Sequence, residues 1–87
     1  MDIIKLIEEA NEKFLFIPKT TINMDRASLS ISFDFDQIFS VGDAVIMTEL
    51  QKSLYEIVEQ KGYKMGDTPC HVFTTNSGII FCMKFWK

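Results

Sequence analysis

The strict alternation of apolar and polar residues from 28 to 35 constrains the fold more than any other feature. Every second side chain is Leu, Ile or Phe, and Ser or Asp stands between them, as in Ser28-Leu29-Ser30-Ile31-Ser32-Phe33-Asp34-Phe35. A repeat of two sends alternate side chains to opposite sides of a strand, so one side is buried and the other faces water. We therefore expect an antiparallel sheet that is covered on one face only.

A hairpin is expected to place a second strand beside this one. The segment 20–24 is predicted as a strand, and a turn at residues 25–26 connects it to a strand over 27–35. The resulting register puts Ile22 and Met24 on the same face as Leu29, whereas a slip of one residue would turn both outward. The expected pairs are Met24 with Ala27 and Ile22 with Leu29.

Helical periodicity precedes each hairpin. Asp2 is expected to cap a first helix whose apolar residues recur every three to four positions, namely Ile3, Ile7, Ala10 and Phe14. Ser40 followed by Asp43 predicts a capping box at the start of a second helix over 41–61, which ends at Gly62. The apolar stripe of that helix consists of Ile46, Leu50, Leu54, Ile57 and Val58. Between the first helix and Pro18, the apolar segment Leu15-Phe16-Ile17 is expected to be buried.

The last third of the chain predicts a second hairpin. The sequence Thr75-Asn76-Ser77-Gly78 is typical of a type I turn in which the glycine adopts a left-handed conformation. That turn pairs Phe73 with Phe81 and His71 with Met83. One face then carries Phe73, Ile79, Phe81, Met83 and Phe85, and the other carries Val72, Thr74, Ile80, Cys82, Lys84 and Trp86.

These elements predict an α+β fold, a two-layer sandwich of order α-β-β-α-β-β. A four-stranded, mainly antiparallel sheet carries two helices on one face, in a single domain over residues 1–87. A hydrophobic fraction of 47% excludes a disordered chain. The order of the strands stays open, because the second helix can join adjacent parallel strands or bridge two antiparallel pairs.

Charge and cysteine content narrow the expected setting. The formal net charge of −3 has the wrong sign for a dedicated duplex-DNA binder. We find no apolar run of the roughly 18 residues that a membrane span needs and no secretory signal, so we expect a cytoplasmic protein with no membrane partner. Cys70 and Cys82 are expected to be reduced thiols that pack as small apolar groups.

The leading candidate site is the face of the last hairpin that points away from the helices. It is partly apolar, which is typical of an interface core, and its expected members are Val72, Ile80, Cys82, Lys84 and Trp86. The alternative is that segment 15–17 or connector 63–69 covers it. The expected function is a small regulatory or inhibitory protein-interaction domain, an accessory protein of a bacterium or its virus. It is expected to form a homodimer through the C-terminal strand or its outer face.

Acidic residues form a second candidate site. Asp34, Asp36 and Asp43 are expected to form an acidic surface for a basic partner. The spacing of Asp34 and Asp36 also fits a metal-dependent enzyme, but the favoured interpretation is that both residues continue the solvated stripe of serines, because the sequence places no histidine or further acid beside them. Cys70 and His71 point to opposite sides of a strand and cannot share a metal. We therefore expect no catalytic residues, no bound metal and no cofactor.

Single-stranded nucleic acid is the remaining alternative partner. Basic and aromatic residues alternate in Lys84-Phe85-Trp86-Lys87 and in Tyr63-Lys64, a combination suited to phosphate contact and base stacking. Four lysines release few counterions, so nucleic acid is the less favoured partner.

Overall fold

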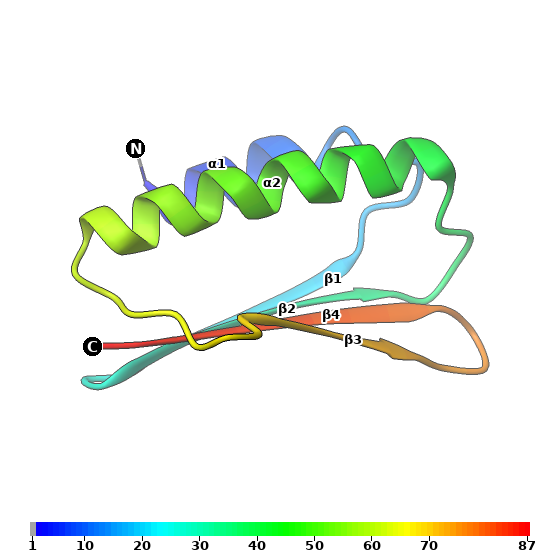
Figure 1. Cartoon of the computed structure of the whole chain (residues 1–87). Helices are drawn as coiled ribbons and strands as arrows, with labels where there is room; N and C mark the ends of the chain where they lie inside the picture. Colours follow the sequence, from blue (N-terminus) through cyan, green and yellow to red (C-terminus); the bar gives the residue numbers. More distant parts are fainter. Residues whose placement is uncertain (1) are drawn as a thin grey trace.

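The computed structural model describes residues 2–87 and has two layers (Figure 1). Its helices and strands follow the predicted order: α1 Ile3–Asn11, β1 Lys19–Met24, β2 Ser28–Phe35, α2 Val41–Gln60, β3 Cys70–Thr74 and β4 Ile79–Trp86. The four strands form one antiparallel sheet, and both helices lie side by side over one of its faces. The α+β two-layer prediction is therefore confirmed.

The strand order β1-β2-β4-β3 settles the connection that the sequence left open. The second helix does not join parallel neighbours. Instead, β2 and β4 pair antiparallel along their whole length, with Ile31 opposite Met83 and Phe33 opposite Phe81. These central strands carry the apolar face under the helices, while β1 and β3 form the two edges of the sheet.

Both helices begin at the predicted caps. The Asp2 carboxylate accepts a hydrogen bond from the Ile4 N–H, and Ser40 and Asp43 form the reciprocal capping box of α2. Gly62 follows the end of α2 with a φ of +89°, a backbone conformation that residues other than glycine rarely adopt. The buried stripe of α2 is rotated slightly from the prediction, since Met47 is buried and Ile46 and Ile57 are half-buried.

The first hairpin has a longer turn than predicted. Met24 pairs with Leu29 and Ile22 with Ile31, and the Asp25 N–H donates to the Ser28 carbonyl at 2.9 Å. This register differs by two residues from the expected one. A shift of two leaves every side chain on its predicted face, so Ile22 still points towards the core.

The last hairpin differs from the prediction by one residue, and this difference exchanges the faces of β3. Phe73 pairs with Ile80 and Val72 with Phe81. The turn closes over two residues instead of three, because the Thr75 N–H donates to the Gly78 carbonyl and the Thr75 hydroxyl accepts from the Gly78 N–H. Gly78 has no positive φ, contrary to the prediction.

The core lies between the sheet and the helices. Leu29, Phe33, Leu54, Val58 and Phe85 are fully shielded from solvent. Four aromatic rings pack edge to face or tilted near the start of α2, namely Phe14, Phe35, Phe39 and Phe81. The prediction that Leu15-Phe16-Ile17 is buried is wrong: all three side chains are exposed.

Candidate functional site

The face of the sheet opposite the helices carries four of the five predicted interface residues. Ile80, Cys82, Lys84 and Trp86 project from β4 on this open face. They stand opposite β2 residues that are all polar, with Trp86 beside Ser28 and Ile80 beside Asp34. The open face is therefore polar over the first hairpin and partly apolar over the second, as the alternation along both strands predicts.

The fifth predicted residue, Val72, lies on the other side of the sheet. Its partner in β4 is the buried Phe81, so Val72 faces the helix layer, where it remains 53% exposed. His71 and Phe73 take its place on the open face, and their rings stack with centroids 6.4 Å apart. They line one side of a shallow groove of about 330 Å³ whose other side is polar. The one-residue change in register is the reason that sequence reasoning missed them.

Trp86 is only partly covered by the rest of the chain. Its side chain is 45% exposed, and the Lys84 ammonium lies 5.6 Å from the ring centroid. The connector reaches Trp86 at Gly66 and pairs through the backbone of Lys64, yet it leaves the ring open to solvent. Segment 15–17 lies near the start of α2 instead. The connector therefore covers this residue in part, and segment 15–17 does not cover it.

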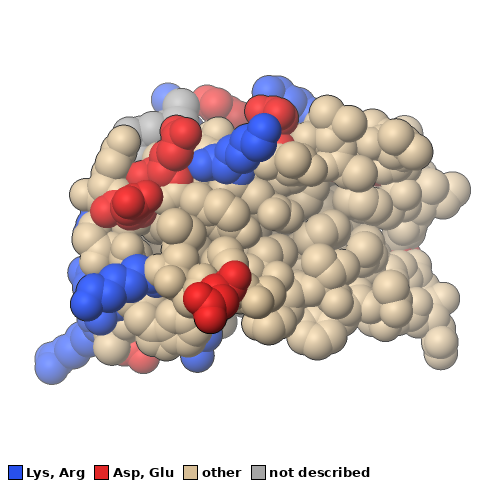
Figure 2. Space-filling view, in the orientation of Figure 1, with Lys and Arg blue, Asp and Glu red and all other residues tan. Residues whose placement is uncertain are grey.

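A second apolar surface gathers where α1 ends and α2 begins. Six large apolar side chains from three segments are exposed there, and we call them the apolar end: Leu15, Phe16, Ile17, Ile38, Val41 and Val45. On the face seen in Figure 2, charged side chains are concentrated on the opposite half of the molecule, and the half around the start of α2 carries none. Sequence reasoning missed this surface, because an apolar run before a proline is more typical of a buried segment.

The carboxylate of Asp43 holds the apolar end together. Its Oδ1 accepts from the Leu15 N–H at 3.0 Å and its Oδ2 from the Ser40 N–H at 2.9 Å. Burial raises the pKa of Asp43, but these donors outweigh burial and hold the pKa below its ordinary value. One charged side chain thus fixes both the exposed loop and the start of α2.

The predicted acidic surface is not assembled. Asp43 is 2% exposed and cannot contact a partner, so its inclusion in that surface is wrong. Asp34 lies on the open face opposite Lys19, whereas Asp36 lies beyond the end of β2. Within residues 2–87, no three His, Cys, Asp or Glu side chains come close enough together to hold a metal ion.

The basic and aromatic segments present fewer rings than the sequence indicates. Phe85 is fully buried and Tyr63 is 7% exposed beneath the Lys87 ammonium, which lies 5.1 Å from its centroid. Of these aromatics only Trp86 is available for stacking. Cys70 and Cys82 are free, half-buried thiols on opposite faces of the sheet. The pKa of Cys70 is raised, mainly because the thiol is buried and to a smaller extent because the Cys82 thiol is nearby.

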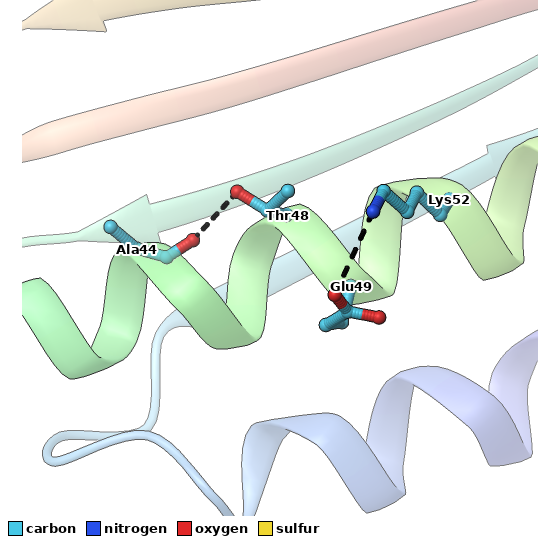
Figure 3. A network of polar contacts seen from close by, with 4 residues as sticks. All are labelled: Ala44, Thr48, Glu49 and Lys52. Atoms are coloured by element: carbon cyan, nitrogen blue, oxygen red, sulfur yellow. Dashed lines mark hydrogen bonds and ion pairs between the residues drawn. The ribbon is translucent and has the colours of Figure 1, made fainter.

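The solvent side of α2 has only local polar contacts. Figure 3 shows the Thr48 hydroxyl donating to the Ala44 carbonyl at 2.9 Å and Lys52 within 3.8 Å of Glu49. All four residues belong to the same helix, and the ion pair is well exposed, so these contacts by themselves do not fix a binding geometry.

Comparison with protein-family models, with curated proteins and with solved structures finds no match for this chain. In the part of the chain that the structure describes, no helix has the length and apolar character to cross a membrane.

Proposed function

We propose that this chain acts by binding another protein, as a small regulatory domain without chemistry of its own. The observation that carries the proposal is the apolar end, where six large apolar side chains are exposed in an arrangement fixed by a buried carboxylate. Exposed apolar patches that are held rigid are typical of protein-interaction sites.

Covering this surface supplies free energy for a contact. Fully burying one large, fully exposed apolar side chain contributes about 1.5–3 kcal/mol, and the contributions of several such side chains have to offset an association cost of about 4–15 kcal/mol. The three exposed residues 15–17 and Val41 carry no charge, so the matching surface is expected to be an uncharged apolar groove or helix face.

The test compares proteins retained from a host extract by the immobilised wild-type chain and by variants. In the double variant Val41→Glu, Val45→Glu, both substituted side chains are well exposed, and the charge at residue 41 lies in the first turn of α2, where the helix dipole favours acidic residues, so we expect the fold to be retained. Ala27→Glu adds a charge at the far end of the sheet as a matched control.

We expect a protein that is retained by both the wild type and Ala27→Glu. The amount of this protein retained by the double variant is expected to be at least tenfold lower. Equal retention by all three chains, or no protein retained by the wild type, contradicts the proposal. Circular dichroism establishes that each variant is folded.

Single-stranded nucleic acid is the second candidate, favoured by the exposed rings of Phe73 and Trp86 with Lys84 on one open face. Trp86 is the single tryptophan of the chain, so its fluorescence reports directly on that face. If the candidate is correct, a single-stranded oligonucleotide quenches the emission at low salt, and added salt or Lys84→Glu removes the effect. Unchanged emission at low salt excludes it.

A further inference from the structure

The outer edge of β3 has free backbone hydrogen-bonding groups. Two backbone hydrogen bonds flank the strand: the Lys84 N–H donates to the Pro69 carbonyl, and the Thr75 N–H donates to the Gly78 carbonyl. Together they show which residues of β3 direct their backbone groups towards β4. Along an antiparallel pair, the residues whose N–H and C=O point to the partner alternate with those whose groups point away. The groups of Cys70, Val72 and Thr74 therefore point away from the sheet.

Nothing in the sequence of β3 protects this edge. Natural edge strands usually carry a lysine, a proline or an inward charge that prevents pairing with another chain. The segment Cys70–Thr74 has none of these, and both Val72 on the helix side and Phe73 on the open side are 53% exposed. The opposite edge differs in its charge, because β1 begins with Lys19. A proline precedes each edge strand, Pro18 before β1 and Pro69 before β3.

We propose that two copies of this chain pair antiparallel through the free edges of β3, with the two-fold axis at Val72. The partner is thus a second copy, and the contact joins two four-stranded sheets into one. This association uses a different surface from the apolar end, so it goes beyond the proposed function.

The register of the dimer follows from which residues have free N–H and C=O groups, namely Cys70, Val72 and Thr74. With the axis at Val72, this residue faces its own copy and Cys70 faces Thr74 of the second copy at both ends. Each facing pair exchanges two bonds, which gives about six in all. Moving the axis to residue 71 or 73 leaves only two such pairs and about four bonds.

The side chains of β3 suit this two-fold arrangement. The segment is nearly symmetric about Val72, with an aromatic ring on each side at His71 and Phe73 and a small residue at each end. On the open face, His71 then lies beside Phe73 of the second copy and extends the existing stack of rings. None of the five side chains carries a fixed charge, so pairing brings no like charges together despite the net charge of −3.

The experiment measures the mass of the chain in solution by sedimentation. The wild type is expected at twice its 10.1 kDa monomer mass when concentrated. Val72→Lys and Val72→Glu each bring two like charges to the axis, so each variant alone is expected at the monomer mass. An equimolar mixture of the two is expected to regain the double mass, because opposite charges then face each other.

Thr21→Lys is the matched control, because it adds the same charge on the other edge strand. The control is expected to keep the double mass. A monomeric wild type, a dimeric Val72→Lys, or a mixture that stays monomeric overturns the proposal. Loss of the dimer in Thr21→Lys, or in Val41→Glu with Val45→Glu, also overturns it by placing the contact elsewhere.

Hydrogen exchange of the wild type tests the same register without a substitution. The amides of Cys70, Val72 and Thr74 are expected to exchange rapidly in dilute samples and to slow at least tenfold on concentration. Those of His71 and Phe73, which bond to β4, are expected to stay slow throughout. Exchange at Val72 that is independent of concentration contradicts the pairing. Capture of a host protein through the apolar end is unaffected by either result.

Discussion

Gly78 lies against the backbone of β2 so closely that no side chain fits there. A Cβ on this residue would stand 2.8 Å from the carbonyl carbon of Phe35 and still closer to its oxygen. The glycine is therefore required by the approach of two backbones and not by a positive φ. The same glycine belongs to the turn that joins β3 and β4, where it bonds to Thr75.

Gly78→Ala is expected to destabilise the fold by about 3 kcal/mol, at the upper end for overpacking, because backbone atoms and not a flexible side chain must move. Urea denaturation measures the change. Gly66→Ala is the control: its Cβ would lie 3.8 Å from the Trp86 ring, an ordinary contact, so its stability is expected to change by less than about 0.5 kcal/mol. Similar values for the two variants would show that the approach at Gly78 is not tight.

Asp43 predicts a loss of stability in acid. Its folded pKa is lower than that of an unfolded aspartate, so the ionised form stabilises the fold above about pH 4 and this contribution is lost as the pH falls through the folded value. Asp43→Asn is expected to cost about 2 kcal/mol at pH 7, since one N–H loses a charged acceptor. Melting temperatures from pH 7 to pH 2 test this, and the variant is expected to show a shallower decline below pH 4. Parallel curves for the two proteins would contradict the assignment.

At the scale of the elements, the ends of α2 are set by local sequence and its exposed side adds little. Ser40 and Asp43 satisfy each other's N–H groups at the first turn, and Gly62 provides the left-handed residue at the last. In contrast, the Glu49–Lys52 pair of Figure 3 has side chains that are 71% and 67% exposed. Exposed pairs of this kind contribute little to folding.

Ser40→Ala is therefore expected to cost about 1–2 kcal/mol, because the Asp43 N–H loses its acceptor in a partly buried cap. Lys52→Ala is expected to change the stability by less than about 0.5 kcal/mol. Chemical denaturation of the two variants under one condition gives the comparison. A larger effect for Lys52→Ala than for Ser40→Ala would be inconsistent with a helix held by its cap.

The difference between local interactions and contacts between distant segments explains which parts of the fold the sequence could predict. Caps, the buried face of α1 and the alternation of β2 depend on neighbours within a few residues and were predicted correctly, and the buried face of α2 was predicted except for a small rotation. The register of β3 was wrong by one residue, because the turn closes over two residues and not three. The approach of Gly78 to Phe35, which is far away in the chain, is likewise not visible in the local sequence. The order of the strands depends on how the two hairpins meet, which no local pattern specifies.

The same difference between local pattern and long-range contact applies to the candidate surfaces. The open face of β4 was predicted because it follows from alternation alone, whereas Val72 was misplaced by the register. The apolar end could not be predicted, because the exposure of Leu15 depends on a hydrogen bond to Asp43 from a segment 28 residues away. That bond also removes Asp43 from the acidic surface.

At the scale of the whole molecule, one thin core joins the two layers. Leu54 is fully buried in the middle of α2, and the fully buried Phe33 and Phe85 come from the two central strands. A domain of this size buries a limited apolar area, so a single cavity between the layers affects all elements at once.

Leu54→Ala is expected to destabilise the whole domain by about 3 kcal/mol, which corresponds to a fall of about 12–24 °C in the melting temperature. Calorimetry or circular dichroism measures this fall. Val41→Ala is the control, because that side chain is 85% exposed and its loss is expected to change the melting temperature by no more than about 4 °C. Equal effects of the two substitutions would mean that the layers do not share one core.

The position of β4 in the middle of the sheet has a consequence for how the protein is made. Residues 79–86 are translated after every other strand, yet they supply the second neighbour of β2 and the sole partner of β3. On the ribosome, the two helices and the first hairpin emerge well before the strand that completes their core. Until residue 86 has left the exit tunnel, one edge of β2 therefore has no partner, and unpaired strand edges of this kind make a nascent polypeptide prone to aggregation.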